Sequence, residues 1–156
     1  MLNITTEQVL RILNLNSDDR IISLFEEHSD IVMLWLKRVT DESWTDVKEG
    51  TAEADILNVY KFAYCYYLLS STVEFLNLKT IGEGIIKTTG IDQQSTELLS
   101  GVEIKSFKKQ LEIKALELVS DYLSPTGFDR LRELKLGSSK LEQNRVRASV
   151  IWKIKS

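Results

Sequence analysis

The chain has 156 residues, of which 43% are hydrophobic and 28% charged, with seven glycines and one proline. These proportions are typical of one globular domain large enough to bury a core, and they argue against a disordered chain or one built from many short strands.

The formal charge of −3 hides an asymmetry: residues 1–60 carry 12 acidic and five basic side chains, and residues 125–156 carry eight basic and three acidic ones. This asymmetry is either solvated surface or a basic end that pairs with an acidic body on another copy or another protein. The start lacks a basic region followed by a long apolar run, so we expect no secretory signal.

The first forty residues predict a short helix followed by a long one. Thr5 with Gln8 three positions later forms a capping box, and the helix that it begins ends at residues 14–16. Ser17 is placed to cap the second helix, which runs to about Val39. Its apolar side chains recur at steps of three, four or seven: Ile21, Phe25, Val32, Trp35 and Val39.

The only histidine and the only cysteine are the first places to look for chemistry. His28 lies on the apolar stripe of the second helix, which favours a packed or hydrogen-bonded interface residue over a metal ligand. Cys65 lies in the most apolar stretch and is predicted to be a core residue in a reducing compartment, with an intermolecular bridge as the alternative. No spacing predicts a metal, a cofactor or a nucleophile with its base. We therefore expect no catalytic residue and no enzyme activity.

Residues 55–78 predict a central helix that is apolar on every side and must therefore be surrounded by the rest of the chain. Lys61 is the only charge between Ile56 and Leu69. A membrane span is disfavoured, because the apolar run is shorter than the ~20 residues that a bilayer core needs. Residues 41–50, just before it, predict an acidic loop whose Trp44 folds back onto the core.

The stretch that follows, residues 79–90, has β-branched residues around a glycine-rich turn and predicts a small β-hairpin or extended arm. It resembles a phosphate-binding loop only in part, since Lys87 stands where the dinucleotide pattern needs glycine and Ile86 stands where the triphosphate loop needs one. We instead regard the arm as a contact for a partner. Its candidate residues are Ile81, Gly82, Gly84, Ile85 and Lys87.

Two more helices complete the predicted body. Ser100 and Glu103 form a capping box for a long helix that runs to Tyr122 and is stopped by Ser124-Pro125. Its polar side is predicted to comprise Lys105, Lys108, Lys109, Glu112 and Lys114. A short helix then begins at Thr126 and Asp129 and ends at Gly137. Recognition of DNA by its basic residues Arg130, Arg132 and Lys135 is disfavoured, because acidic residues interleave and the chain has a pI near 5.3.

Residues 138–156 differ from the helical domain of residues 1–137 and form a basic C-terminal arm. Val150, Trp152 and Ile154 alternate as one face of a strand, and a strand with no sheet of its own can add to the edge of another chain. The predicted partner-binding residues are Arg145, Arg147, Val150, Trp152 and Ile154.

The order of these features resembles the head-tail connector proteins of tailed bacteriophages, also called adaptor or head-completion proteins. The likeness covers roughly residues 4–136: the Thr-x-x-Gln helix start, the Ser17-Asp18-Asp19 start of a long helix, the aromatic central helix, the arm at 82–90, and residues 95–100 leading into a helix with Tyr122-Leu123 near its end. The resemblance implies a helical subunit that forms a ring, expected to be dodecameric, below the portal and lets DNA pass. It also implies contacts with the portal protein and with tail or stopper proteins, at the head-tail junction of the virion after assembly in the host cytoplasm. A monomer in isolation is compatible with this role.

The expected fold is all-α, a compact bundle of about four to five helices around the central apolar helix, with the arm and the C-terminal tail extending from it. The alternative function is that of a small bacterial helical scaffolding or regulatory protein acting through protein-protein contacts. Neither interpretation involves a cofactor or a membrane.

Overall fold

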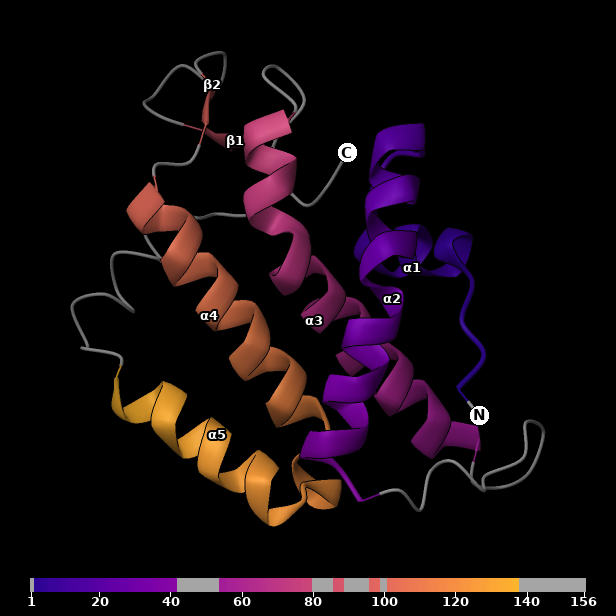
Figure 1. The fold of residues 1–156 in the computed structure, drawn as a ribbon, viewed down its shortest axis with the longest axis vertical. Coiled ribbons are helices and arrows are strands. Elements are labelled where there is room, and N and C mark those ends of the chain that lie inside the picture. The colour runs from indigo at the N-terminus through magenta and orange to yellow at the C-terminus, as the bar shows by residue number, and fades with distance from the viewer. Residues whose placement is uncertain (1, 42–53, 80–85, 89–95, 99–100, 138–156) are drawn as a thin grey trace.

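The computed structural model describes residues 2–41, 54–79, 86–88, 96–98 and 101–137, and these are predominantly helical (Figure 1). The helices are α1 (Thr6–Leu13), α2 (Asp19–Val39), α3 (Ala54–Lys79), α4 (Gly101–Leu118) and α5 (Pro125–Leu136), with a 3-10 turn at Ser120–Tyr122. Two short strands, β1 (Ile86–Thr88) and β2 (Thr96–Leu98), pair antiparallel. The predicted all-α class is confirmed.

Helix α1 begins and ends on its own local sequence. The Thr5 side-chain oxygen accepts a hydrogen bond from the backbone N–H of Gln8, and the Gln8 side chain accepts one from the backbone N–H of Thr5. These two bonds satisfy donors that have no partner in the first turn of a helix. Asn14 ends the helix in the left-handed region, at φ 54°. The predicted capping box and helix end are both confirmed.

Helix α2 begins one residue later than predicted, because Asp18 and not Ser17 is its N-cap. The Asp18 carboxylate accepts a hydrogen bond of 2.7 Å from the backbone N–H of Arg20, and its negative charge suits the positive end of the helix dipole. The helix ends at Val39, as predicted.

Helix α3 packs against α4, α2 and α1. Tyr60, Ala63 and Cys65 are fully buried, as the apolar pattern predicts. Phe62 and Phe75, however, are 43% and 40% exposed. The prediction that this helix is surrounded on every side is therefore wrong at these two positions, because its three helical neighbours leave part of its surface open.

Helix α4 ends at Leu118, although its apolar periodicity predicted a helix as far as Tyr122. The cause is a long-range backbone contact: Leu123 is extended and forms an isolated antiparallel bridge with Thr40. The N–H of Asp41 donates to the carbonyl of Tyr122 and the N–H of Ser124 to the carbonyl of Val39, each at 2.9 Å. We call this pairing of residues 39–41 with residues 122–124 the α2–α5 clasp. Ser100, the predicted cap of α4, lies outside the described residues.

Helix α5 is capped by Ser124 and not by Thr126 or Asp129. The Ser124 hydroxyl accepts a hydrogen bond from the N–H of Gly127 and donates one of 2.8 Å to the carbonyl of Arg38 on α2. Pro125 occupies the first turn, where its missing N–H is not needed. Gly137 is the C-cap, as predicted.

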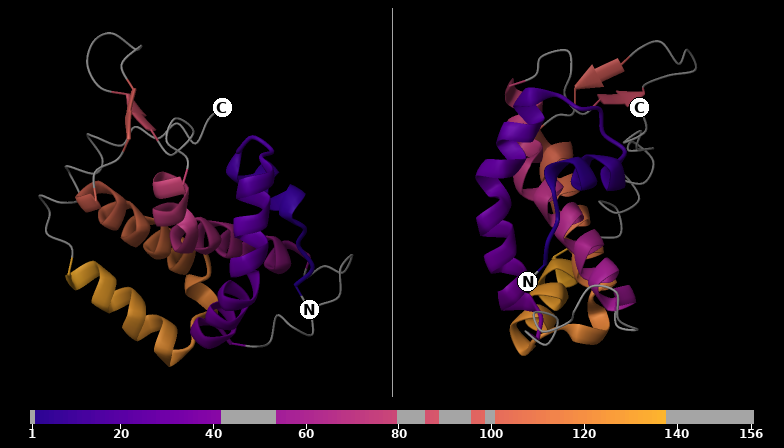
Figure 2. Two further views of the ribbon diagram at one scale, coloured as in Figure 1. Left: turned by 45° about the horizontal axis from the view of Figure 1, so that its top comes forward. Right: turned by 90° about the vertical axis from the view of Figure 1, so that its right-hand side faces the viewer.

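The strand pair differs from the predicted hairpin. Ile86, Lys87 and Thr88 lie opposite Leu98, Glu97 and Thr96, so the partner strand comes after residue 90 rather than before residue 85. The predicted glycine turn at residues 82–84 lies outside the described residues, as do Trp44 and the C-terminal arm. The pair lies at one end of the helical body, beyond the C-terminal end of α3 and the N-terminal end of α4 (Figure 2). At the other end of α4, α5 folds back against α4 and α2. Among the described helices, none reaches the length and hydropathy that a bilayer crossing requires.

Candidate functional site

Nine of the ten predicted contact residues lie in segments that the structure does not describe. These are the five in the C-terminal arm (Arg145, Arg147, Val150, Trp152 and Ile154) and four in the glycine-rich arm (Ile81, Gly82, Gly84 and Ile85). Lys87 is in β1, opposite Glu97. All ten stay predictions, and the described surface is that of the helices.

His28 is a packed residue at the interface of α2 and α3. Its Nδ1 lies 3.2 Å from the carbonyl oxygen of Leu24, and its ring is tilted against the ring of Phe75 at a centroid distance of 5.4 Å. In the part of the chain that the structure describes, no three His, Cys, Asp or Glu side chains are grouped to hold a metal ion. The geometry agrees with the packed interpretation of this histidine.

Cys65 is a core residue, as predicted. Its side chain is fully buried on α3, and burial raises the pKa of its thiol to about 12. The thiolate is the nucleophilic form of cysteine, so this thiol is inert at neutral pH.

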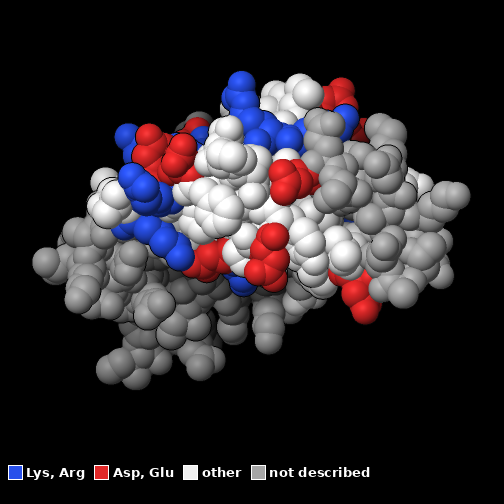
Figure 3. Space-filling view, turned by 90° about the horizontal axis from the view of Figure 1, so that it is seen from below, with Lys and Arg blue, Asp and Glu red and all other residues white. Residues whose placement is uncertain are grey.

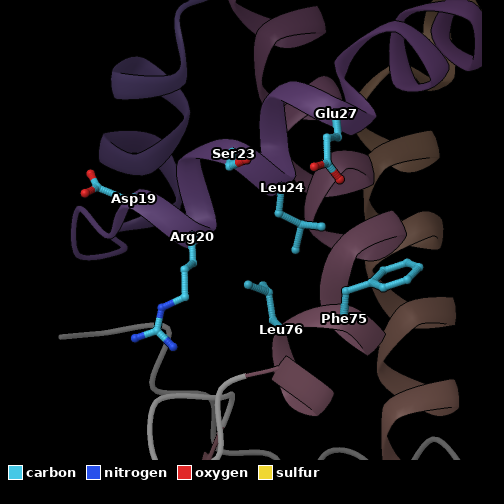
Figure 4. Close-up of a pocket in the computed structure, with 7 residues that line it drawn as sticks. All are labelled: Asp19, Arg20, Ser23, Leu24, Glu27, Phe75 and Leu76. Carbon is cyan, nitrogen blue, oxygen red and sulfur yellow. The ribbon is translucent and has the colours of Figure 1, made fainter.

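A groove between α2 and α3, with a volume of about 270 Å³, is the first surface hollow to consider (Figure 4). Leu24, Phe75 and Leu76 give it an apolar lining. Its charged side chains, Asp19, Arg20 and Glu27, all come from α2 and point in different directions. Acid-base or nucleophilic chemistry needs charged groups that converge on one atom, so this groove suits an apolar contact better than a reaction.

Large apolar side chains are exposed on α2 and α5. Ile31 and Leu34 on α2 are 59% and 66% exposed, and Phe128 and Leu136 on α5 are 56% and 79% exposed. A hollow of about 440 Å³ runs along α5 between Phe128 and Leu136. Exposed apolar groups that gather on one surface and are bordered by polar residues are typical of protein-protein contacts. Neither surface was predicted from the sequence, because periodicity identifies apolar residues but not the neighbours that cover them.

A buried ion pair joins α4 to α5. Glu112 was predicted to lie on the solvated side of α4, and this prediction is wrong: it is 7% exposed, and its two carboxylate oxygens accept hydrogen bonds of 2.7 and 3.0 Å from Arg130. These hydrogen bonds raise the pKa of Arg130 above its usual value. Arg130, one of the three bases considered for DNA binding, is therefore occupied by an internal contact.

An aromatic stack lies beside this ion pair. The rings of Trp35 on α2 and Tyr67 on α3 are stacked, with centroids 3.6 Å apart and planes 5° from parallel. Burial, and then the negative charge of Glu112, raise the pKa of the Tyr67 hydroxyl to about 12. Together the stack and the ion pair hold α2, α3, α4 and α5 at one junction, which is a structural role.

No protein-family model, curated protein or solved structure matches this chain. An inference about function therefore depends on the order of its elements and on its exposed surfaces.

Proposed function

We propose that this chain is a structural virion protein of a tailed phage, which joins the portal of the head to the tail by forming a ring through which DNA passes. It acts without catalysis and without a cofactor, through contacts with the portal protein, with tail or stopper proteins and with copies of itself. Its place is the head-tail junction of the virion, reached from the host cytoplasm during assembly.

The exposed apolar side chains of α2 and α5 are the observation that carries this proposal. A subunit whose task is to bind neighbours needs apolar contact surface outside its own core. Ile31, Leu34, Phe128 and Leu136 provide it on two helices of one helical body. The resemblance of the order of sequence features to the connector family is a second support for the proposal.

The charge distribution supports passage of DNA rather than tight binding to it. The first 60 residues carry an excess of acidic side chains. Neutralisation of DNA phosphates by basic side chains supplies much of the affinity of proteins for DNA. Acidic side chains carry the same charge as the phosphates and cannot neutralise them. A ring that presents such a surface to DNA lets the duplex slide.

The two extended segments complete the proposed assembly. The glycine-rich arm, with Ile81, Gly82, Gly84, Ile85 and Lys87, lines the ring or meets a tail component. The basic C-terminal arm docks on the portal, where its alternating apolar residues add to the edge of a partner. Its residues for this contact are Arg145, Arg147, Val150, Trp152 and Ile154.

The test is deletion of residues 138–156, followed by co-purification with the portal protein encoded by the same genome. We expect helicity and melting temperature to stay unchanged, because the helices contact one another within residues 2–137, and portal binding to be lost. Lys105→Ala, an exposed change on α4, is the matched control and should bind as the full chain does. Unchanged binding after the deletion refutes docking by the C-terminal arm.

Electron microscopy of the portal mixed with the full chain separates the two functions considered for this chain. A connector gives rings with the symmetry of the portal. A bacterial scaffolding or regulatory protein gives neither rings nor an association with virions, and that result refutes the proposed function.

A further inference from the structure

One face of α2 carries an apolar patch next to acidic residues. Glu27, Asp30, Ile31 and Leu34 follow one another at steps of one, three or four residues, so they share a stripe on the helix surface. Glu27 and Asp30 are exposed, as are Ile31 and Leu34, and none of the four side chains belongs to the core of this protomer. We call this the acidic stripe of α2.

One face of α5 carries the opposite combination. Phe128, Leu131, Arg132 and Lys135 recur at the same spacing, and all four line the hollow along this helix. Phe128 is 56% exposed, and Leu131 is partly buried against the core. Seen from below, the end of the molecule that carries α5 shows uncharged surface bordered by basic and acidic groups (Figure 3). We call these four residues the basic stripe of α5.

The two stripes match when the helices are aligned antiparallel. One register opposes two apolar pairs and two pairs of opposite charge: Leu34 with Phe128, Ile31 with Leu131, Asp30 with Arg132, and Glu27 with Lys135. A parallel alignment of the same stripes instead places Glu27 against Phe128 and Leu34 against Lys135. The charges therefore favour this antiparallel register over the parallel alignment.

We infer that the acidic stripe of α2 in one copy docks antiparallel on the basic stripe of α5 in a neighbouring copy. This inference rests on the proposed function, since the ring makes a second copy the occupant of each stripe. A contact between two different surfaces is head-to-tail, and it generates a ring when the rotation between copies closes. The inference adds the residues, direction and register of the contact between subunits.

The Asp30–Arg132 pair is the sharpest place to test the contact. Lys135 already lies 2.8 Å from Glu117 in its own chain, so Glu27 joins a pair that exists before assembly. Each stripe spans about two helical turns, so the contact buries less surface than a standard interface of ~1,600 Å². Self-association is therefore weak and has to be measured over a wide range of protein concentration.

The experiment reverses the two charges separately in the full chain. Asp30→Arg and Arg132→Asp each place like charges across the contact, and we expect each to weaken self-association at least tenfold by sedimentation velocity and native mass spectrometry. An equal mixture of the two variants restores association, because the arginine introduced in one variant then faces the aspartate introduced in the other, and the unchanged Asp30 faces the unchanged Arg132. Asp121→Arg, an exposed reversal in the 3-10 turn, is the matched control and associates as the unchanged chain does.

Three results overturn the inference: a full chain that stays monomeric at every concentration, reversed charges that leave its association unchanged, and a mixture that fails to recover it although circular dichroism shows both variants folded. A mixture that recovers only a closed dimer supports the α2–α5 contact and counts against the ring. Failure of the unchanged full chain to bind the portal, together with intact rescue by mixing, refutes the proposed function alone, so the two failures are distinguishable.

Discussion

Gly127 is the residue on which the approach of α5 to α2 depends. A β-carbon at this position would clash with the backbone carbonyl oxygen of Val39 and would lie 2.8 Å from Cδ2 of Leu123. The backbone of Val39 is held by the hydrogen bond from Ser124, so it has little freedom to move away. Only glycine lets the first turn of α5 come this close to the end of α2.

We predict that Gly127→Ala lowers the free energy of unfolding by about 2 kcal/mol, the size expected when an extra carbon is forced into close packing. Gly101→Ala is the matched control, since nothing lies within 4 Å of a β-carbon at that position. The control is expected to change stability by less than about 0.5 kcal/mol. Urea denaturation measures both, and equal effects of the two substitutions contradict the prediction.

At the scale of residues, the features that could be predicted from the sequence are those set by residues close together along the chain. The bonds between Thr5 and Gln8 span three positions, and the buried state of Cys65 follows from an apolar stretch, so both were predictable. The burial of Glu112 was not. Its partner Arg130 is 18 positions away on another helix, and no local pattern distinguishes a paired carboxylate from a solvated one.

At the scale of elements, the Glu112–Arg130 ion pair holds α5 against α4. Glu112 is buried, whereas the Arg130 side chain is 44% exposed and also reaches Glu133 on its own helix at 3.3 Å. Because water screens the guanidinium in part, the pair contributes less than a fully buried one.

We predict that Arg130→Ala lowers the free energy of unfolding by about 2 kcal/mol, because the Glu112 carboxylate then stays buried without its hydrogen bonds. The loss of unfolding free energy in the chain with both Glu112→Ala and Arg130→Ala should be smaller than the sum of the losses in the two single variants. The double variant leaves no unpaired partner, whereas each single variant leaves one. Lys105→Ala, an exposed change on α4, should change stability by less than about 0.5 kcal/mol. Additive effects in denaturation curves refute the coupling.

The helices were predictable as elements, but not all of their ends were. Apolar periodicity extended α4 to Tyr122, and the structure ends it at Leu118 because Leu123 pairs with Thr40. The pairing of β1 with β2 was missed because the glycines at 82 and 84 suggested a partner strand before residue 85, whereas β1 pairs with residues 96–98. At the end of α4, a contact distant in sequence outweighed the local pattern.

At the scale of the whole molecule, the core holds several groups that ionise only at high pH. Burial raises the pKa of Tyr64, Tyr67 and Cys65 to about 12, and it raises the pKa of Tyr60 as well. The ordinary values are 10.0 for tyrosine and 9.0 for cysteine. A raised pKa in the folded state means that the unfolded chain loses its protons first as pH rises, and proton loss from the unfolded chain favours unfolding.

We therefore predict that stability is unaffected by these groups below pH 9 and falls as pH rises from about 9 to about 12. Cys65→Ala removes the group with the lowest ordinary pKa among these. The stability of this variant should therefore begin to fall only near pH 10, the ordinary pKa of tyrosine. Guanidinium denaturation at fixed pH values measures both profiles. A flat profile up to pH 12, or the same onset in both chains, contradicts the prediction.

The extent to which other helices cover α3 is also a property of the whole molecule. Its apolar residues were predictable, but the exposure of Phe62 and Phe75 depends on where α1, α2 and α4 pack against it. The same holds for the stripes on α2 and α5, whose members are visible in the sequence while their exposure is not.

The α2–α5 clasp has a consequence for how this protein emerges during synthesis. The N–H of Asp41 donates to the carbonyl of Tyr122, and the carbonyl of Val39 accepts from the N–H of Ser124, so the end of α2 stays incomplete until residues 122–124 have left the ribosome. Closing so long a loop carries an entropic penalty that local helix formation does not. The nascent protein therefore forms its helices early and acquires the final arrangement of α2 and α5 only after residues 122–124 have been synthesised.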